Sequence, residues 1–420
     1  MYKKLFNSRI FSNGDIHFDS AATTPPFLAV ENVVANFLKN YGSVHRGAGR
    51  KSKLSTSLYE KSREDIKDFV NASSDSNYVV FTKNTTEAMN QLAHFFSFLP
   101  GKIAVSHIEH SSSSLPFIVA EGLRGGDLTE IQNLGRLQVL EYENPGHLEK
   151  LLTVNKIKAV VVTAASNVTG YCPPIKEISE IVHRNRADSY LIVDACQYVQ
   201  HHSISMLNLG IDFLCASGHK MYAPYGAGFY VAPKTFLDQF IPYQIGGGNL
   251  PYITSEREFI RYQNNQAHDP GTPNALGAVA IAAAIEQLQE IGLKEIQEYE
   301  FNLTNLAFSK LKKVTGISLY VDEKKITNII PFNLNKWNFN ELAEILDTRY
   351  NIAVRAGSFC VYNFVREIMG IGQDEHIANA VRAGDKSLIP GFVRASFSLL
   401  NDETDVEVFT KAIKELANER

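Results

Sequence analysis

The 420-residue sequence has few cysteines, almost no excess charge of either sign and no long apolar run. Its four cysteines, Cys172, Cys196, Cys215 and Cys360, are too few for a disulfide framework, and none has the spacing of a zinc site. Forty-one Lys and Arg against 45 Asp and Glu leave a net charge of −4, so no overall positive field attracts nucleic acid. We therefore expect no disulfide scaffold, no metal centre and no nucleic-acid partner.

Membrane-spanning segments are also lacking. The most apolar stretch, residues 277–285, is far shorter than the roughly 20 residues of a membrane helix. Lys3 and Lys4 near the N-terminus are not followed by an apolar run, so a secretory signal is not expected. Because 45% of the residues are hydrophobic, the chain has ample material for a core. These features predict a soluble, cytoplasmic protein with no membrane partner.

Short apolar runs alternate with helical patterns through the first 230 residues. Such runs are typical of strands covered on both faces, and their alternation with helices predicts a mainly parallel α/β sheet. The loop between Gly218 and Gly226 has no room for a crossover helix, so the last two strands are expected to be antiparallel. The predicted strands are 78–82, 102–106, 137–141, 158–163, 190–194, 212–216 and 228–231, with helices at 86–96 and 175–184.

The pattern changes after residue 249. Helical periodicity at 275–298 and 301–313, apolar runs at 317–321 and 328–332, and a helical pattern from Glu403 predict a smaller α+β domain. We therefore expect a large α/β domain over residues 16–270, with residues 1–15 and 271–420 forming the small domain.

Two neighbouring strands of the predicted sheet end in polar residues that can carry chemistry. One strand is followed by Ser217-Gly-His-Lys220 and the other ends in Asp194, at the edge where open α/β sheets place ligands. Taken alone, the lysine is most simply a solvated charge and the aspartate a helix or turn cap. Together they suit pyridoxal phosphate, because they offer an amine for its aldehyde and a carboxylate that keeps its ring an electron sink.

A third segment, Phe81-Thr-Lys-Asn-Thr-Thr-Glu-Ala88, leads from a strand through hydroxyl residues into a helix. The N–H groups of a helix start and the hydroxyls of Thr85 and Thr86 predict a phosphate cradle. The alternative is an ordinary helix cap. A capping box starting at Thr85 has Ala88 where the acid belongs, which favours the cradle. His110 follows the next strand and is a candidate to stack on the cofactor ring, although single histidines are more often structural.

In this order the motifs resemble the class V (fold type I) pyridoxal phosphate enzymes, specifically the cysteine desulfurase and selenocysteine lyase family of the SufS-like group. The resemblance covers nearly the whole chain. It implies a mainly parallel seven-stranded sheet covered by helices, pyridoxal 5′-phosphate as cofactor, and a homodimer with shared active sites. The matching segments are Phe18-Asp-Ser-Ala-Ala-Thr-Thr24, Val44-His-Arg-Gly47, Tyr59-Glu-Lys-Ser-Arg63, the 81–88 segment, Ser166-Asn-Val-Thr-Gly170, Val193-Asp-Ala-Cys-Gln197, Ser217-Gly-His-Lys220, Asp269-Pro-Gly-Thr-Pro-Asn274, Val354-Arg-Ala-Gly-Ser-Phe-Cys360 and Val393-Arg-Ala-Ser-Phe397.

The resemblance also implies residue roles. Lys220 would bind the cofactor and move the substrate α-proton, and Asp194 would pair with the pyridine nitrogen. Arg394 would grip the substrate carboxylate in a bidentate pair. Cys360 would attack the substrate sulfur as a thiolate, which leaves a persulfide and alanine. The other residues implied are Thr85, Thr86, His110, Asn167, Gln197, Ser217, His219 and the neighbouring subunit's Thr272 for the cofactor, and Asn167, Arg355, His45 and Arg46 for the substrate.

The expected function is the conversion of L-cysteine or selenocysteine to L-alanine, with a protein as sulfur acceptor. The sequence departs from the better-known members at Ser358-Phe359, where those carry His-His, and in a long connection at 371–392. One alternative is a class V aminotransferase, epimerase or other lyase that does not use Cys360. Another is a non-catalytic scaffold for a sulfur-acceptor partner. The alternative for Cys360 is that it packs as a small buried apolar residue, and this is the role that we expect for Cys196 and Cys215.

Overall fold

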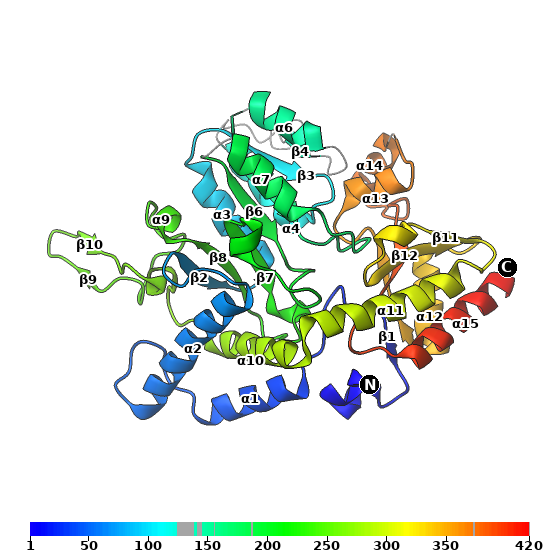
Figure 1. Cartoon of the computed structure of the whole chain (residues 1–420), viewed down its shortest axis with the longest axis horizontal. Coiled ribbons are helices and arrows are strands. Elements are labelled where there is room, and N and C mark those ends of the chain that lie inside the picture. Colours follow the sequence, from blue (N-terminus) through cyan, green and yellow to red (C-terminus); the bar gives the residue numbers. More distant parts are fainter. Residues whose placement is uncertain (124–137, 141–144, 155, 186–187, 373, 420) are drawn as a thin grey trace. The chain divides into compact units, whose positions relative to one another are not determined.

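The structure is a computed structural model of the chain that describes residues 1–123, 138–140, 145–154, 156–185, 188–372 and 374–419. The chain forms two compact units (Figure 1). The larger consists of Pro25–Ala164 and Pro173–Ile291, and the smaller of Met1–Thr24, Ala165–Cys172 and Gly292–Arg420.

The larger unit contains a seven-stranded sheet in the order β2-β8-β7-β6-β5-β3-β4. All neighbours are parallel except β8, which is antiparallel to both β2 and β7. The predicted mainly parallel sheet and the antiparallel last pair are both confirmed. Residues 137 and 141 of one predicted strand lie outside the described residues. The strands are β2 (Asn77–Thr82), β3 (Lys102–Ser106), β4 (Gln138–Leu140), β5 (Ile157–Thr163), β6 (Tyr190–Asp194), β7 (Phe213–Ser217) and β8 (Gly228–Pro233).

The strands other than β4 form here because nearly every side chain along them is buried, as in β5, where all seven residues are buried. Alternate residues such as Val80, Val161 and Phe213 share one apolar core with Leu92 and Phe96 of α3 (Thr85–Ser97). Parallel strands end at a common edge, and the register aligns the last residue of β5 with the last of β6. The predicted cofactor residues therefore follow strands at one edge of the sheet.

Helices cover this sheet and extend the larger unit. Helix α10 packs against α1 and α2, and the short strands β9 (Tyr252–Ile253) and β10 (Phe259–Ile260) form a separate hairpin. The helices are α1 (Leu28–Lys39), α2 (Arg50–Phe69), α3, α4 (Ser111–Leu123), α6 (Pro145–Val154), α7 (Ile175–Asn185), α8 (Met206–Leu209), α9 (Lys234–Leu237) and α10 (Ala275–Ile291), with short 3-10 turns η4 (Gly218–Lys220) and η5 (Asn265–His268).

The smaller unit is an antiparallel sheet, β11-β12-β15-β14, packed with helices. Phe332, Leu342, Val393 and Phe409 belong to its core. Its elements are η1 (Tyr2–Leu5), η2 (Ser8–Phe11), β1 (Ile16–His17), α11 (Leu293–Leu311), β11 (Ile317–Leu319), η6 (Glu323–Lys325), β12 (Ile329–Leu334), α12 (Phe339–Tyr350), β13 (Ile352–Ala353), β14 (Arg355–Gly357), α13 (Tyr362–Ile368), α14 (Glu375–Arg382), β15 (Phe392–Ser396) and α15 (Glu403–Glu419).

The unit boundaries differ from the predicted 16–270 division. Residues 16–24 join the smaller unit because β1 pairs in parallel with β13. The helix predicted over 275–298 is wrong as a single element. Gly292, at φ +92°, separates α10 from α11, and α10 stays with the larger unit. Among the described residues no single helix is long and apolar enough to cross a membrane, although α10 and α11 taken as a broken pair meet the length and composition test.

Candidate active site

The carboxyl edge of the large sheet brings Thr85 and Ser217 together. The backbone N–H of Thr85 donates to the Ser217 hydroxyl at 2.7 Å, and the two hydroxyls also lie 2.7 Å apart. Gly228 on β8 permits this approach, because a Cβ there would lie 2.7 Å from the Cα of Asn84. Thr85 is the first residue of α3, so both side chains lie at a helix N-terminus, where phosphate groups bind well.

The cap of α3 differs from the sequence expectation. Asn84 is the N-cap, and its side chain accepts from the backbone N–H of Glu87 at 3.0 Å. The Glu87 carboxylate in turn accepts from the N–H of Lys83 at 2.6 Å. The cap of α3 therefore lies at Asn84 rather than at Thr85, and the predicted mismatch at Ala88 does not favour a phosphate cradle. The contact between Thr85 and Ser217 is independent of this cap.

Asp194 ends β6 as a buried carboxylate with two donors. Its Oδ1 accepts from the backbone N–H of Cys196 at 2.9 Å, and its Oδ2 accepts from the hydroxyl of Ser113. These hydrogen bonds fix the plane of the carboxylate. Ser113 is fully buried in the first turn of α4 and was not predicted as a site residue. The serine run directly after His110 is the only sequence signal that points to it.

Lys220 and Gln197 contact each other at the same carboxyl edge of the sheet. Lys220 ends η4, and its ammonium donates to Oε1 of Gln197 at 3.3 Å. The side-chain nitrogen of Gln197 is buried and has no hydrogen-bond partner among the described residues. Buried amide donors are nearly always paired, with protein, water or a ligand. The unpaired nitrogen therefore indicates a polar acceptor that binds close to Lys220.

His219 is a neutral imidazole in this structure. Burial, and secondarily the charge of Lys220, lowers the pKa of His219 to about 4. Near neutral pH its ring thus offers one donor and one acceptor. The preceding Gly218 cannot carry a side chain, because a Cβ would lie 2.8 Å from Ile281 and 2.9 Å from the carbonyl of Ala223. Close packing at Gly218 therefore fixes the backbone from which the side chains of His219 and Lys220 extend.

His110 lies at the start of α4. Its Nδ1 accepts from the backbone N–H of Ser112 at 3.1 Å, so a neutral ring carries its proton on Nε2. Thr86 reaches the same helix start, with its hydroxyl 2.7 Å from that of Ser112. The structure thus links the predicted ring-stacking and phosphate-binding residues through Ser112. The stacking itself remains a prediction.

His45 and Arg46, which were predicted to contact the substrate, both have partners within the larger unit. Nε2 of His45 lies 2.8 Å from Glu60, and Arg46 donates to two backbone carbonyls, one of them that of Gly271. Thr272 is exposed immediately after this anchor point. These contacts give His45 and Arg46 a role in holding loops, and their contact with substrate stays a prediction, as does the reach of Thr272 into a neighbouring subunit.

A buried ion pair anchors the same loop to α2. The fully buried Arg63 donates to Asp269, which also accepts from the hydroxyl of Tyr59 at 2.9 Å. Burial lowers the pKa of Arg63, but Asp269, Tyr59 and Glu60 together raise it above its usual value. His45, Glu60 and Asp269 bring ligand atoms within 4.8 Å of one another. The guanidinium already neutralises that cluster and would repel a metal cation.

In the smaller unit, Arg394 on β15 is 2% exposed. Its Nη1 donates to the carbonyl of Asn167 at 2.7 Å and its Nη2 to Asp19 at 3.2 Å, while its Nε has no hydrogen-bond partner among the described residues. Burial lowers the pKa of Arg394 to about 10, against the raising effect of Asp19. It remains a cation at neutral pH, and its unpaired donor suits a carboxylate. Arg355 is more exposed, and its guanidinium lies 4.0 Å from the carboxylate of Asp19. Asp19 was not predicted as a site residue.

Cys360 is exposed on the turn between β14 and α13. Phe359 and Cys360 both have left-handed backbones, with φ of +52° and +60°, which is uncommon for residues other than glycine. The Asn167 amide donates to the Phe359 carbonyl at 2.9 Å, and the Ser358 hydroxyl donates to the carbonyl of Pro390. The turn is thus held at defined points while Cys360 is exposed.

The other three cysteines are less accessible. Cys196 and Cys215 are buried, which confirms their expected packing role, and burial raises the pKa of Cys215 well above its usual value. Burial likewise raises the pKa of Cys172 to about 12. Of the four cysteines, Cys360 is the exposed one.

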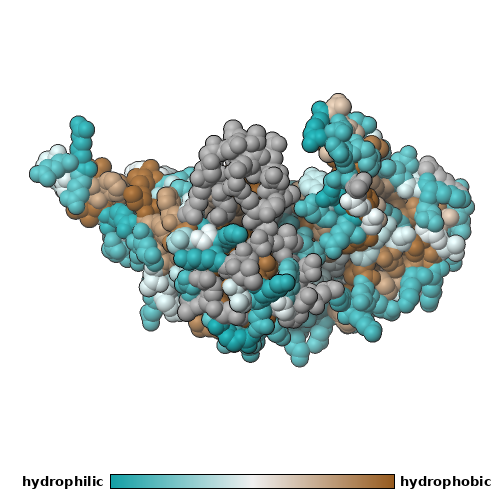
Figure 2. All heavy atoms as spheres, turned by 90° about the horizontal axis from the view of Figure 1, so that it is seen from above, coloured by the Kyte–Doolittle hydropathy of each residue, from teal (hydrophilic) through white to brown (hydrophobic). Residues whose placement is uncertain are grey.

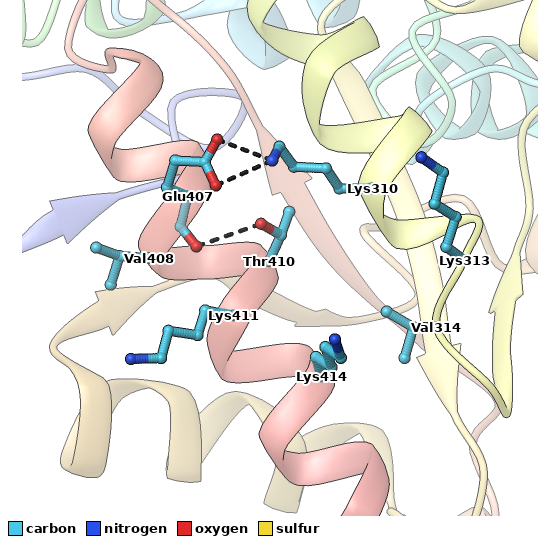
Figure 3. A pocket seen from close by; sticks show the side chains of 8 residues that line it. All are labelled: Lys310, Lys313, Val314, Glu407, Val408, Thr410, Lys411 and Lys414. Atoms are coloured by element: carbon cyan, nitrogen blue, oxygen red, sulfur yellow. Dashed lines mark hydrogen bonds and ion pairs between the residues drawn. The ribbon is translucent and has the colours of Figure 1, made fainter.

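A groove of about 570 Å³ lies between α11 and α15 in the smaller unit (Figure 3). Lys310 pairs there with Glu407 at 2.8 Å, and it lies in the last turn of α11, where a helix terminus favours positive charge. These contacts account for its charge, and no predicted site residue lines it. The lining residues are Lys310, Lys313, Val314, Glu407, Val408, Thr410, Lys411 and Lys414.

The sequence of residues 16–409 matches the model of the class-V aminotransferase family, so the chain belongs to this family of enzymes. Within it, the chain is a member of the cysteine desulfurase group, which confirms the resemblance seen in the motifs. A probable cysteine desulfurase of Halalkalibacterium halodurans is 30% identical, over 98% of this chain and 96% of its own. One from Pyrococcus abyssi is 31% identical, over 96% and 94%. A solved cysteine desulfurase from Thermococcus onnurineus has a TM-score of 0.84 at 28% identity, covering 98% of this chain and 96% of that chain.

Proposed function

We propose that the protein is a pyridoxal 5′-phosphate-dependent cysteine desulfurase. It converts L-cysteine, or selenocysteine, to L-alanine and holds the sulfur on Cys360. The observation that carries this proposal is the turn of Cys360, which exposes the thiol and is hydrogen-bonded to Asn167. Asn167 also accepts from Arg394, so the exposed thiol and the carboxylate-binding cation belong to one hydrogen-bonded network.

The larger unit offers residues that fit the cofactor. Lys220 would hold the aldehyde carbon and Asp194 the pyridine nitrogen, and the unpaired amide nitrogen of Gln197 fits the ring hydroxyl. When bound, the cofactor supplies an electron sink that makes the substrate α-proton acidic. Lys220 would then move that proton with its amine. The proposed phosphate and ring contacts are Thr85, Thr86, His110, Ser217, His219 and the partner subunit's Thr272.

The substrate carboxylate would bind Arg394. Two of its donors already hold it to Asn167 and Asp19, and its Nε remains available. A guanidinium that is fixed in this way loses little freedom when it binds a carboxylate. Asn167 would complete this contact, and the more exposed Arg355 would guide the anion in.

Cys360 would carry out the sulfur transfer. Its thiolate attacks the sulfur of the substrate, a sulfur–sulfur bond forms, and the carbon–sulfur bond breaks with its electron pair going to carbon. A proton delivered to that carbon leads to alanine. The thiolate form of cysteine is a strong nucleophile. The exposure of Cys360 supports delivery of the sulfur to an acceptor protein.

The proposal includes a homodimer. The β9–β10 hairpin has apolar side chains in contact with solvent, with Tyr252 62% and Ile253 58% exposed. Figure 2 shows apolar residues along the arm to which this hairpin belongs. A two-stranded hairpin is marginal alone, and an apolar surface of this kind marks an interaction site. A second copy that covers it would also bring Thr272 to its partner's cofactor.

The Cys360→Ser variant tests the function. We expect it to bind pyridoxal phosphate and to change its visible absorption when L-cysteine is added, because those steps need Lys220 rather than the thiol. It should form no persulfide and release no alanine. The assay measures alanine and sulfide together, with L-cysteine and a thiol reductant.

Two controls make the result specific. Cys172→Ser removes a thiol of raised pKa from the same unit and should leave alanine release at the wild-type level. Lys220→Ala should lose both the visible absorption and all turnover. Alanine release by Cys360→Ser at the wild-type rate would contradict the desulfurase proposal and favour an aminotransferase or epimerase. A wild-type protein that never takes up the cofactor would favour a non-catalytic scaffold.

A further inference from the structure

Phe359 occupies the position directly before the nucleophile, and its ring lies on a buried cation. The guanidinium carbon of Arg394 is 4.7 Å from the centroid of the Phe359 ring. Phe359 is 9% and Arg394 is 2% exposed, so little water screens the contact. A desolvated cation–π contact is among the stronger ones of its kind.

The backbone of Phe359 is tied to the same cation by a second route. Its carbonyl accepts from the side chain of Asn167 at 2.9 Å, and the carbonyl of Asn167 accepts from Arg394 at 2.7 Å. Ring and backbone thus connect Phe359 to one guanidinium. Any shift of Arg394 therefore acts on the turn at two points.

The turn itself is conformationally restricted. Phe359 and Cys360 are consecutive left-handed residues, a backbone that persists only where surrounding contacts hold it. Gly391 packs so tightly on Gly357 that a Cβ there would lie 2.8 Å from the Gly357 backbone. The base of the turn is therefore fixed, and the contacts of Ser358 and Phe359 hold the residues above it.

We propose that Phe359 is a positioning residue that orients Arg394 for the substrate carboxylate and transmits carboxylate binding to the thiol of Cys360. The inference rests on the proposed function and deepens it. A carboxylate that binds the guanidinium competes for its charge and fixes its plane. The stacked ring and the Asn167 bridge then adjust the Cys360 turn. The Cys360 thiol is therefore oriented for attack when a ligand that carries a carboxylate is bound. This selects amino acids over amines that lack a carboxylate.

The test compares two ligands that differ only in the carboxylate. L-Alanine carries it, and L-alaninamide replaces it with a neutral amide. Binding to the cofactor-loaded enzyme is followed by visible absorption, and the Cys360 thiol by its rate of alkylation with iodoacetamide at saturating ligand. Phe359→Leu removes the ring, and Phe359→Tyr restores it.

We expect Phe359→Leu to weaken L-alanine binding by about fivefold to thirtyfold, the range for a partly to fully desolvated cation–π contact, and to leave L-alaninamide binding unchanged. Phe359→Tyr should bind both as the wild type does. In the wild type the two ligands should give different Cys360 alkylation rates, and in Phe359→Leu the same rate. Phe364→Leu, which removes the same volume from the same apolar cluster, should behave as the wild type.

Equal weakening of both ligands, or of neither, in Phe359→Leu would overturn the positioning role. So would an unchanged difference between the two alkylation rates in that variant, or the absence of a difference in the wild type. These outcomes are separate from failure of the proposed function. That failure would show in the wild type as missing cofactor absorption or missing alanine release from L-cysteine.

Discussion

Replacing Asp269 by alanine should destabilise the larger unit more than any exposed ion-pair variant. Arg63 has no solvent-exposed side-chain area, and Asp269 is its closest charged partner. Without it the guanidinium keeps its hydrogen bonds to the Val79 carbonyl and the Tyr59 hydroxyl. It also keeps the longer contact with Glu60, 3.4 Å from Nε, and the rings of Tyr59 and Phe81. Breaking a buried pair from one side costs about 3–5 kcal/mol, and the remaining contacts favour the lower end.

About 3 kcal/mol corresponds to a drop of about 6–12 °C in Tm for a unit of this size. Tm is measured by scanning calorimetry or circular dichroism. The matched control is Asp65→Ala, which breaks an exposed pair with Lys61 worth about 0.5 kcal/mol and should shift Tm by less than about 2 °C.

The double variant Arg63→Met with Asp269→Leu separates charge from packing. It leaves no uncompensated ion and should recover part of the lost stability. If Asp269→Ala melts within 2 °C of Asp65→Ala, the buried pair does not hold the loop and the reasoning fails.

Three further predictions concern single groups. Burial, and secondarily the charges of Arg63 and Arg261, lowers the pKa of His268 to about 4. As the pH falls, this histidine is therefore protonated in the unfolded chain before it is protonated in the folded protein. The protein thus loses stability as the pH falls from about 6.5 towards 4. His268→Gln should reduce the slope of unfolding free energy against pH there by about 1.4 kcal/mol per unit, and an unchanged slope would refute this. Thr272→Ala mixed with Lys220→Ala should regain activity, since one site of the mixed dimer carries both lesions and the other neither; no recovery despite proven subunit exchange contradicts a shared site. Cys215→Ser should lower Tm while leaving kcat for alanine release near wild type, and a selective loss of kcat would oppose a purely structural role.

Most of the large sheet could be predicted from local sequence. Strands β3 and β6 have the bounds that their apolar runs predict, 102–106 and 190–194, because strands buried on both faces carry their signal in consecutive residues. The loop after residue 218 was short enough to decide the direction of the last pair. The residues at strand ends followed from the same pattern, since a parallel sheet gathers them at one edge.

Features set by distant contacts could not be predicted in this way. The break at Gly292 is one glycine within a continuous helical pattern, and only its left-handed backbone separates α10 from α11. The hydrogen bond from Ser113 to Asp194 joins residues 81 positions apart. The stack of Phe359 on Arg394 requires two strands of the smaller sheet to be neighbours. The spacing of apolar residues within one segment contains no information about such distant contacts.

The assembly of the smaller unit from three separate segments has a consequence for biosynthesis. Phe18 is fully buried in the core of that unit, and its carbonyl accepts from the hydroxyl of Ser396, 378 residues later. At a synthesis rate of about 5–20 residues per second, the N-terminal segment waits about 20–75 s for this partner. The larger unit is complete in sequence at residue 291 and can fold during that time. The N-terminal segment is therefore an apolar tail on a nascent chain, whose exposure ends only when β15 leaves the ribosome.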